Sequence, residues 1–145
     1  MNLKTVELLL IEDNEGDIFL TTQAFKSAKV SNNLSVVRDG EEAMEYLNRQ
    51  GKYSSATRPD LVLLDLNLPK IDGRQVLGNM KADPELRSIP VVVLTSSQAE
   101  KDVAKAYDLQ ANAYVVKPVD FENLGRIVSS IENFWFTVVK LPIDP

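Results

Sequence analysis

Reactive side chains stand at the ends of four of the five apolar runs in this sequence. Two carboxylates, Glu12 and Asp13, follow the first run, and a third, Asp65, ends the third run. A hydroxyl, Thr95, ends the fourth run, and an amine, Lys117, follows the fifth. Clustered carboxylates repel one another unless a cation lies between them, and oxygen ligands without His or Cys select Mg²⁺ or Mn²⁺. We therefore predict metal-assisted chemistry on a phosphate group.

Each of these residue types has a use in phosphoryl transfer. A carboxylate such as Asp65 can act as a nucleophile and form an acyl phosphate. The ammonium of Lys117 can hold one phosphate oxygen as a point charge, and the Thr95 hydroxyl can donate a hydrogen bond to a second. Taken singly, each residue also fits an ordinary role, as a helix cap, a turn residue or a solvated lysine. The prediction depends on their occurring together at strand ends.

A doubly wound α/β fold would bring these strand ends to one place. The predicted strands are 6–11, 34–37, 60–65, 90–95 and 113–116. The predicted helices between and after them are 15–29, 40–50, 73–82, 98–109 and 120–139. This alternation indicates right-handed βαβ crossovers and a parallel sheet with helices on both faces. In such sheets ligands bind outside the carboxyl ends of the strands, where the reactive residues stand.

The composition is that of an ordinary globular domain and excludes several function classes. The chain has 145 residues, of which 44% are hydrophobic and 26% charged. A net charge of -5 argues against a nucleic-acid partner. The absence of Cys excludes disulfides and zinc–thiolate sites, and the absence of His excludes a phosphohistidine carrier. The apolar runs are too short to span a bilayer and the N-terminus is no signal peptide, so we expect a cytoplasmic protein without a membrane partner.

Four motifs carry a resemblance to a known family. LLLIEDN, LVLLDLNLPKIDG, PVVVLTSS and AYVVKP stand in the order and spacing of receiver domains of bacterial two-component response regulators. The resemblance covers residues 6–132. It implies a flavodoxin-like sheet with strand order 2-1-3-4-5. It also implies a non-enzymatic phosphoacceptor, whose Asp65 takes a phosphoryl group from the phosphohistidine of a sensor histidine kinase.

The same resemblance implies a role for each site position. The metal-site positions are Glu12, Asp13, Asp65 and the backbone carbonyl of Asn67. Lys117 matches the phosphate-binding lysine of the family, Thr95 its switch hydroxyl, and Tyr114 its rotating aromatic residue. By analogy, the peptide bond between Lys117 and Pro118 is expected to be cis.

Two positions depart from the commonest receiver pattern. Glu12 stands where Asp is usual, and Ser96 follows the switch residue where many members have Ala or Gly. Both changes are mild, so phosphorylation is still expected. The flanking segments EDNEGDIFLTTQAF, ADPELRSIPVVVLTSS and SIENFWFTVVKLP resemble single-domain regulators that partner bacterial, notably cyanobacterial, phytochromes. That resemblance implies a phytochrome as the kinase partner.

The C-terminal segment predicts a protein interface. We expect one receiver domain over 1–145, with a core at 6–132 and a helical extension at 133–145, whose output runs through protein contacts. A helix over 121–139 is about 28 Å long, whereas a typical strand spans only about 17–20 Å. Its surplus final turns carry the aromatic residues Phe134, Trp135 and Phe136. Such a patch favours a homodimer, with packing on the chain's own domain or contact with the kinase as alternatives.

Two other functions fit the same fold. A Mg²⁺-dependent phosphatase with an aspartate nucleophile usually carries an acid two residues further on, where this chain has Asn67. A flavin- or nucleotide-binding module would need a phosphate-binding turn after the first strand. Here that turn is EDNEGD, whose carboxylates repel a phosphate unless a metal is present. Turnover of phosphomonoesters, or a coloured protein, would distinguish these alternatives from a phosphoacceptor.

Overall fold

The computed structural model describes residues 5–27, 31–107 and 109–118, and in this part five parallel strands form one sheet. The strands are β1 (Val6–Ile11), β2 (Asn32–Val37), β3 (Leu61–Asp65), β4 (Val91–Thr95) and β5 (Ala113–Val116). The helices are α1 (Glu15–Lys26), α2 (Gly40–Leu47), α3 (Gly73–Ala82) and α4 (Gln98–Ala106), with a short 3-10 turn, η1 (Gly51–Tyr53). The strand order is β2-β1-β3-β4-β5, which confirms the predicted order.

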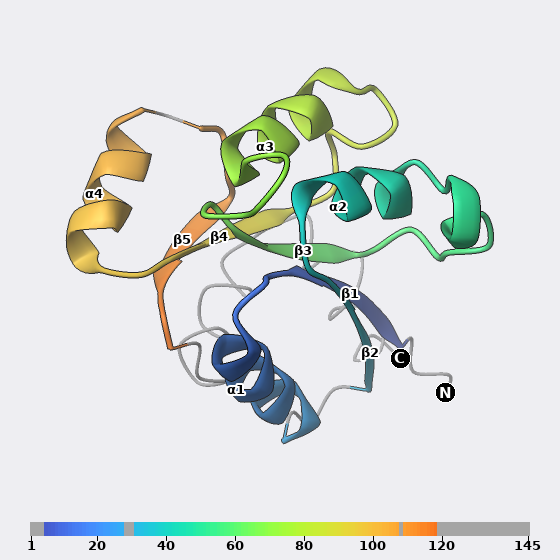
Figure 1. Cartoon of the computed structure of the whole chain (residues 1–145), viewed down its shortest axis with the longest axis horizontal. Helices are drawn as coiled ribbons and strands as arrows, with labels where there is room; N and C mark the ends of the chain where they lie inside the picture. Colours follow the sequence, from blue (N-terminus) through green and yellow to red (C-terminus); the bar gives the residue numbers. More distant parts are fainter. Residues whose placement is uncertain (1–4, 28–30, 108, 119–145) are drawn as a thin grey trace, which may run out of the picture.

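The strands are apolar along most of their length because both faces of the sheet are covered (Figure 1). On one face, alternate strand residues such as Leu8 and Leu10 pack with Ile18 and Phe25 of α1. On the other face, the intervening residues pack with α2, α3 and α4, whose buried side chains include Leu47, Val76, Leu77, Met80 and Ala104. Each fully buried Leu or Val contributes about 1.5–3 kcal/mol, so this packing holds the strand ends in place.

Several predicted element boundaries differ from the observed ones. The helices predicted over 40–50 and 98–109 end at Leu47 and Ala106. In the first case Arg49 adopts a φ of 55°, a left-handed conformation that a helix cannot continue through. The strand predicted over 34–37 starts at Asn32, because that residue pairs with Val6 of β1. The helix predicted over 120–139 lies outside the described residues.

Every helix in the described part begins at a residue that caps it. The side chains of Asn14, Asp39, Asp72 and Ser97 accept hydrogen bonds from backbone N–H groups in the first turns of α1, α2, α3 and α4. Such caps stabilise a helix by about 1 kcal/mol each. Because each cap follows a strand within a few residues or a short loop, the helix N-termini gather at the carboxyl edge of the sheet. None of the helices in the described ranges has the length and apolar character needed to cross a membrane.

Two glycines let the loops at this edge pack tightly. A Cβ on Gly73 would lie 2.4 Å from the backbone oxygen of Asp65, and one on Gly40 would lie 1.9 Å from that of Ile71. The N–H of Gly73 also donates to the carbonyl oxygen of Leu66 at 3.0 Å. These contacts hold the start of α3 directly against the end of β3, where the central carboxylate stands.

Candidate functional site

The register of the sheet brings the reactive residues to one edge. Ile11 pairs with Leu64, so Glu12, which follows Ile11, stands level with Asp65. Thr95 pairs with Val116, so Lys117 stands one residue beyond the end of that pair. Segments that are distant in sequence therefore end side by side at the carboxyl edge of β1, β3, β4 and β5.

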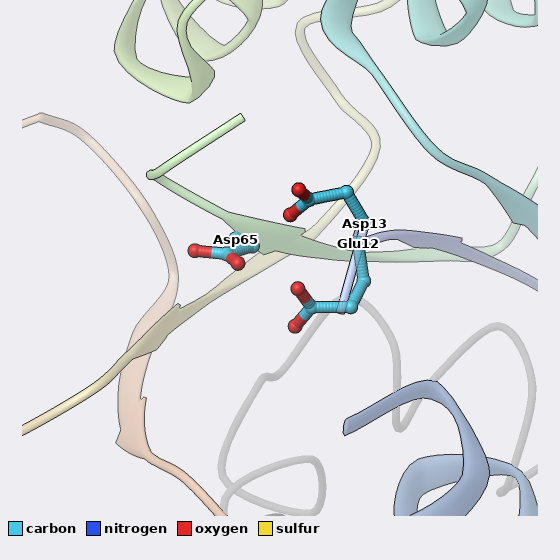
Figure 2. Close-up of side chains that lie close together, drawn as sticks. All are labelled: Glu12, Asp13 and Asp65. Carbon is cyan, nitrogen blue, oxygen red and sulfur yellow. The ribbon is translucent and has the colours of Figure 1, made fainter. Parts of the chain in front are cut away.

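Three carboxylates form the centre of the site. One oxygen from each of Glu12, Asp13 and Asp65 lies within 4.8 Å of the others. Figure 2 shows the side chains of Glu12 and Asp13 extending from the end of β1 toward the side of Asp65. Glu12 is 0% exposed and Asp65 is 3% exposed, whereas Asp13 is open to solvent. The site is thus a cluster of carboxylates, two of them buried and one exposed to solvent.

Lys117 places its ammonium among these carboxylates. Its Nζ lies 2.8 Å from Glu12 Oε1, 2.8 Å from Asp17 Oδ2 and 3.1 Å from Asp65 Oδ2. Its backbone N–H donates to the carbonyl oxygen of Thr95 at 2.8 Å, which fixes the residue at the end of β5. The bond to Pro118 is cis, as predicted.

The buried charges change the acid–base behaviour of the cluster. Burial, followed by the neighbouring Asp65, raises the pKa of Glu12 from 4.5 to about 7, against the opposing effect of Lys117. Burial alone would lower the pKa of Lys117, but hydrogen bonds to Asp17 and Glu12 and the attraction of Asp65 raise it above its usual range. Lys117 therefore stays positively charged, while Glu12 is partly protonated near neutral pH.

The donor set suits a hard divalent cation. Each of the three clustered residues offers an oxygen, and a chain without His or Cys has no imidazole or thiolate ligand. Such ligands match Mg²⁺ and Mn²⁺. Burial and then the neighbouring Asp65 raise the pKa of Glu12, and a cation bound among these oxygens would favour its ionised form.

Asn67 is tied to the same centre. Its backbone N–H donates to Asp65 Oδ1 at 2.9 Å, which holds the carboxylate in one rotation. Its side-chain Nδ2 lies 3.2 and 3.3 Å from the two carboxylate oxygens of Glu100, in the first turn of α4. The loop after β3 is therefore linked to α4. The predicted role of the Asn67 carbonyl as a metal ligand stays a prediction.

Thr95 and Tyr114 lie on the neighbouring strands β4 and β5. Thr95 is 0% exposed, and its Oγ1 donates to the carbonyl oxygen of Val115 at 3.2 Å. The hydroxyl is thus engaged with the backbone of β5 in this structure. Tyr114 is half-buried against the core between the sheet and α2, α3 and α4. The predicted switch roles of both residues stay predictions.

Comparison of the sequence with known proteins identifies the family of this chain. The response regulator receiver domain family matches residues 8–129 of the chain. The chain belongs to the response regulator receiver family. The receiver match begins within β1, extends past β5 and contains all four strand ends described above.

Related receivers cover nearly the whole chain. Response regulator Rcp1 of Synechocystis sp. is 45% identical over 135 residues, which are 93% of this chain and 92% of that protein. The crystal structure of the phosphorylated cyanobacterial phytochrome response regulator RcpA is 48% identical and covers 92% of this chain and 96% of its own, with a TM-score of 0.75. The Mn²⁺-bound form of Rcp1 is 44% identical and covers 91% and 95%, with a TM-score of 0.73. This receiver is therefore related to phytochrome response regulators.

One residue of the site was missing from the sequence prediction. Asp17, in the first turn of α1, contacts Lys117 as closely as Glu12 does. Its signal in the sequence is weak, because an acidic residue in a first helical turn is usually explained by the helix dipole. The predicted interface residues Phe134, Trp135 and Phe136 lie outside the part of the receiver that the structure describes.

Proposed function

We propose that this receiver accepts a phosphoryl group on Asp65 from the phosphohistidine of a sensor histidine kinase, in a Mg²⁺-dependent reaction. The observation that supports the proposal most directly is the position of the Asp65 carboxylate. It is buried, and one of its oxygens lies 3.1 Å from the ammonium of Lys117. With Glu12 and Asp13 it forms a group of oxygens close enough to hold a metal ion. Phosphoryl transfer needs positioning and neutralisation of charge, and this cluster supplies both.

Each residue of the site has its own role in the proposed phosphoryl transfer. An oxygen of Asp65 attacks phosphorus, the new O–P bond forms, and the N–P bond breaks with its electron pair staying on the imidazole of the kinase. The N–H of Asn67 keeps the attacking carboxylate oriented through its bond to Oδ1. The ammonium of Lys117 holds a phosphoryl oxygen, because it already lies within hydrogen-bond reach of Asp65. Bound at Glu12, Asp13 and Asp65, Mg²⁺ would supply charge neutralisation for the carboxylates and the phosphoryl oxygens.

We further infer that Thr95 and Tyr114 report the phosphorylated state. The Thr95 hydroxyl now donates to the Val115 carbonyl, one residue from Tyr114 on β5. A phosphoryl oxygen on Asp65 is a stronger acceptor than a carbonyl, so the hydroxyl is expected to turn toward it. That turn would break the hydrogen bond to the residue that follows Tyr114 on β5.

The proposed partner is a phytochrome-type kinase, supported by the names of the related regulators. A homodimer through the last helix is proposed from the sequence pattern alone. Sedimentation of wild type, Trp135→Ala and a chain cut after Glu132, each with and without a phosphodonor, tests the dimer. Wild type should sediment as a dimer and the two variants as monomers. Three monomers at high micromolar concentration in both states would end this proposal.

The phosphoacceptor role is tested by intact mass after incubation with acetyl phosphate and Mg²⁺. Wild type should gain one phosphoryl group that is labile to base. Asp65→Asn, which keeps the volume of the side chain, and wild type in chelator should gain none. An undiminished adduct on Asp65→Asn, or a reaction insensitive to chelator, would contradict the assignment. Sustained turnover of phosphomonoesters would instead favour the phosphatase alternative.

A further inference from the structure

Asp17 is a carboxylate of the site that lies apart from the clustered metal-binding oxygens. The group that could hold a metal in the described residues consists of Glu12, Asp13 and Asp65, and Asp17 does not belong to it. Even so, Asp17 Oδ2 lies 2.8 Å from Nζ of Lys117, closer than Asp65 Oδ2 at 3.1 Å. Asp17 is thus a partner of the lysine and not of the predicted metal.

The position of Asp17 is set by a rigid element. Asn14 caps α1, and its Oδ1 accepts a hydrogen bond from the backbone N–H of Asp17 at 2.9 Å. The next residue, Ile18, is buried in the core between α1 and the sheet. The helix N-terminus also favours a negative charge at this place. The backbone of Asp17 is therefore held in a fixed position relative to the end of β1, and its carboxylate is within reach of Lys117.

The other two partners of Lys117 serve a second purpose. Glu12 and Asp65 contact the lysine in this structure, and both belong to the predicted metal group. A divalent cation among these oxygens would take up their charge and repel the ammonium. An ammonium has three N–H donors, which here reach three carboxylates. Of these three acceptors, only Asp17 would keep its full attraction for the lysine.

We propose that Asp17 is a positioning residue for phosphoryl transfer. It holds the ammonium of Lys117 beside Asp65 after the other carboxylates have turned to the metal, so that one N–H remains directed at an incoming phosphoryl oxygen. This inference depends on the proposed phosphoacceptor function. It differs from a purely structural role, in which Asp17 would only place a charge at the start of α1.

Glu15 provides a matched control for the structural role. It lies in the same first turn of α1, but its side chain is 78% exposed and it pairs with Arg38 instead of Lys117. Replacing Asp17 or Glu15 by its amide removes the same charge from the same helix end. Only the change at Asp17 should affect the lysine.

Phosphorylation by acetyl phosphate in saturating Mg²⁺, followed by intact mass, measures the rate. Asp17→Asn should slow it about tenfold, because a weaker hydrogen bond to a neutral amide replaces one between two charged groups, and Glu15→Gln should leave it unchanged. In a Lys117→Met background, Asp17→Asn should have almost no further effect. Asp17→Glu should recover part of the rate. The affinity for Mg²⁺, measured by calorimetry, should change less than the rate does in Asp17→Asn, because Asp17 is outside the group of oxygens that could hold the metal.

Urea unfolding gives a second readout that does not depend on activity. A double-mutant cycle with Asp17→Asn and Lys117→Met should show coupling in chelator, and that coupling should persist or grow in Mg²⁺. The corresponding cycle with Glu12→Gln and Lys117→Met should weaken in Mg²⁺. A cycle for Asp17 that vanishes in Mg²⁺ would overturn the inference.

The two proposals fail in different ways. If wild type forms no adduct on Asp65, the phosphoacceptor function is wrong. If wild type is phosphorylated and Asp17→Asn reacts at the same rate, or slows equally with and without Lys117, only the positioning role of Asp17 is wrong.

Discussion

Replacing Asp65 with asparagine should make the metal-free protein more stable at slightly alkaline pH. Three carboxylates, those of Glu12, Asp17 and Asp65, contact the ammonium of Lys117, and Asp13 lies near Glu12 and Asp65, so negative charge is in excess when no metal is bound. Asparagine keeps the volume of the buried side chain and removes one of these charges. Lys117 still has Glu12 and Asp17 as partners, both at 2.8 Å, so the ammonium is not left unpaired.

The pKa of Glu12 sets the size of this effect. Burial, and then Asp65, raise that pKa from 4.5 to about 7. Keeping the group ionised in the folded state costs roughly 3 kcal/mol well above that pH. Because the pKa is raised, the stability that Glu12 contributes is fully present below its unfolded value and is lost as pH rises through about 7. Asp65 is the second cause after burial, so removing its charge should restore about 1 kcal/mol, or roughly 3 °C in Tm.

Urea and thermal unfolding in chelator measure the difference, at about pH 8 and about pH 5.5. The advantage of Asp65→Asn should shrink at the lower pH, where Glu12 of the wild type is protonated. Glu41→Gln, at an exposed carboxylate in the first turn of α2, is the control and should change little. Mg²⁺ should stabilise wild type far more than Asp65→Asn. An Asp65→Asn protein no more stable than wild type at pH near 8 in chelator would refute the charge crowding inferred here.

Three further changes have defined outcomes in the same unfolding assay. Gly73→Ala should lower the free energy of unfolding by about 1–3 kcal/mol, because its Cβ would lie 2.4 Å from the backbone oxygen at the end of β3. Gly78→Ala is the control: a Cβ there meets open space within α3, and alanine should raise stability by about 0.5–1 kcal/mol. Lys117→Met in chelator should cost about 3 kcal/mol, because two buried carboxylates lose their cation, and Mg²⁺ should recover part of the loss. Tyr53→Phe removes the hydrogen bond that is the main cause of the lowered pKa of Glu42. A carboxyl group whose pKa is lowered by folding stabilises the fold at pH above its pKa in the unfolded chain, and this stabilisation is lost as pH falls through its pKa in the folded protein. Tyr53→Phe should therefore lose less stability than wild type on acidification.

Apolar runs and helix-capping residues in the sequence predicted most of the strands and helices. Unbroken apolar runs such as Leu61–Leu64 indicate strands covered on both faces, and the structure places them at the centre of the sheet. Cap residues such as Asp72 mark helix starts, because a side chain bonds to N–H groups only two or three residues away. These signals are local, so they can be recognised in the sequence without knowledge of the rest of the molecule. The strand order came from the resemblance to receivers and not from the pattern itself.

Helix ends were predicted less well than helix starts. The helix predicted over 40–50 ends at Leu47, because the chain turns through a left-handed residue at Arg49. Arginine has no special preference for that conformation, so its presence in the sequence gives no warning. The turn is held by backbone hydrogen bonds, such as that from the N–H of Gln50 to the carbonyl oxygen of Glu45.

The sequence by itself determined which side chains stand at the carboxyl edge of the sheet, because strand ends follow from apolar runs. Only the tertiary structure decided how those side chains pair. Asp17 and Lys117 are 100 positions apart, and they meet because the start of α1 and the end of β5 both lie at the carboxyl edge of the sheet. The Thr95 hydroxyl bonds to β5 through a rotamer that no sequence pattern records. Likewise the pKa of Glu12 depends on burial and on the distance to Asp65. Distances between separate segments are set by register, packing and rotamers, and electrostatic interactions depend on those distances.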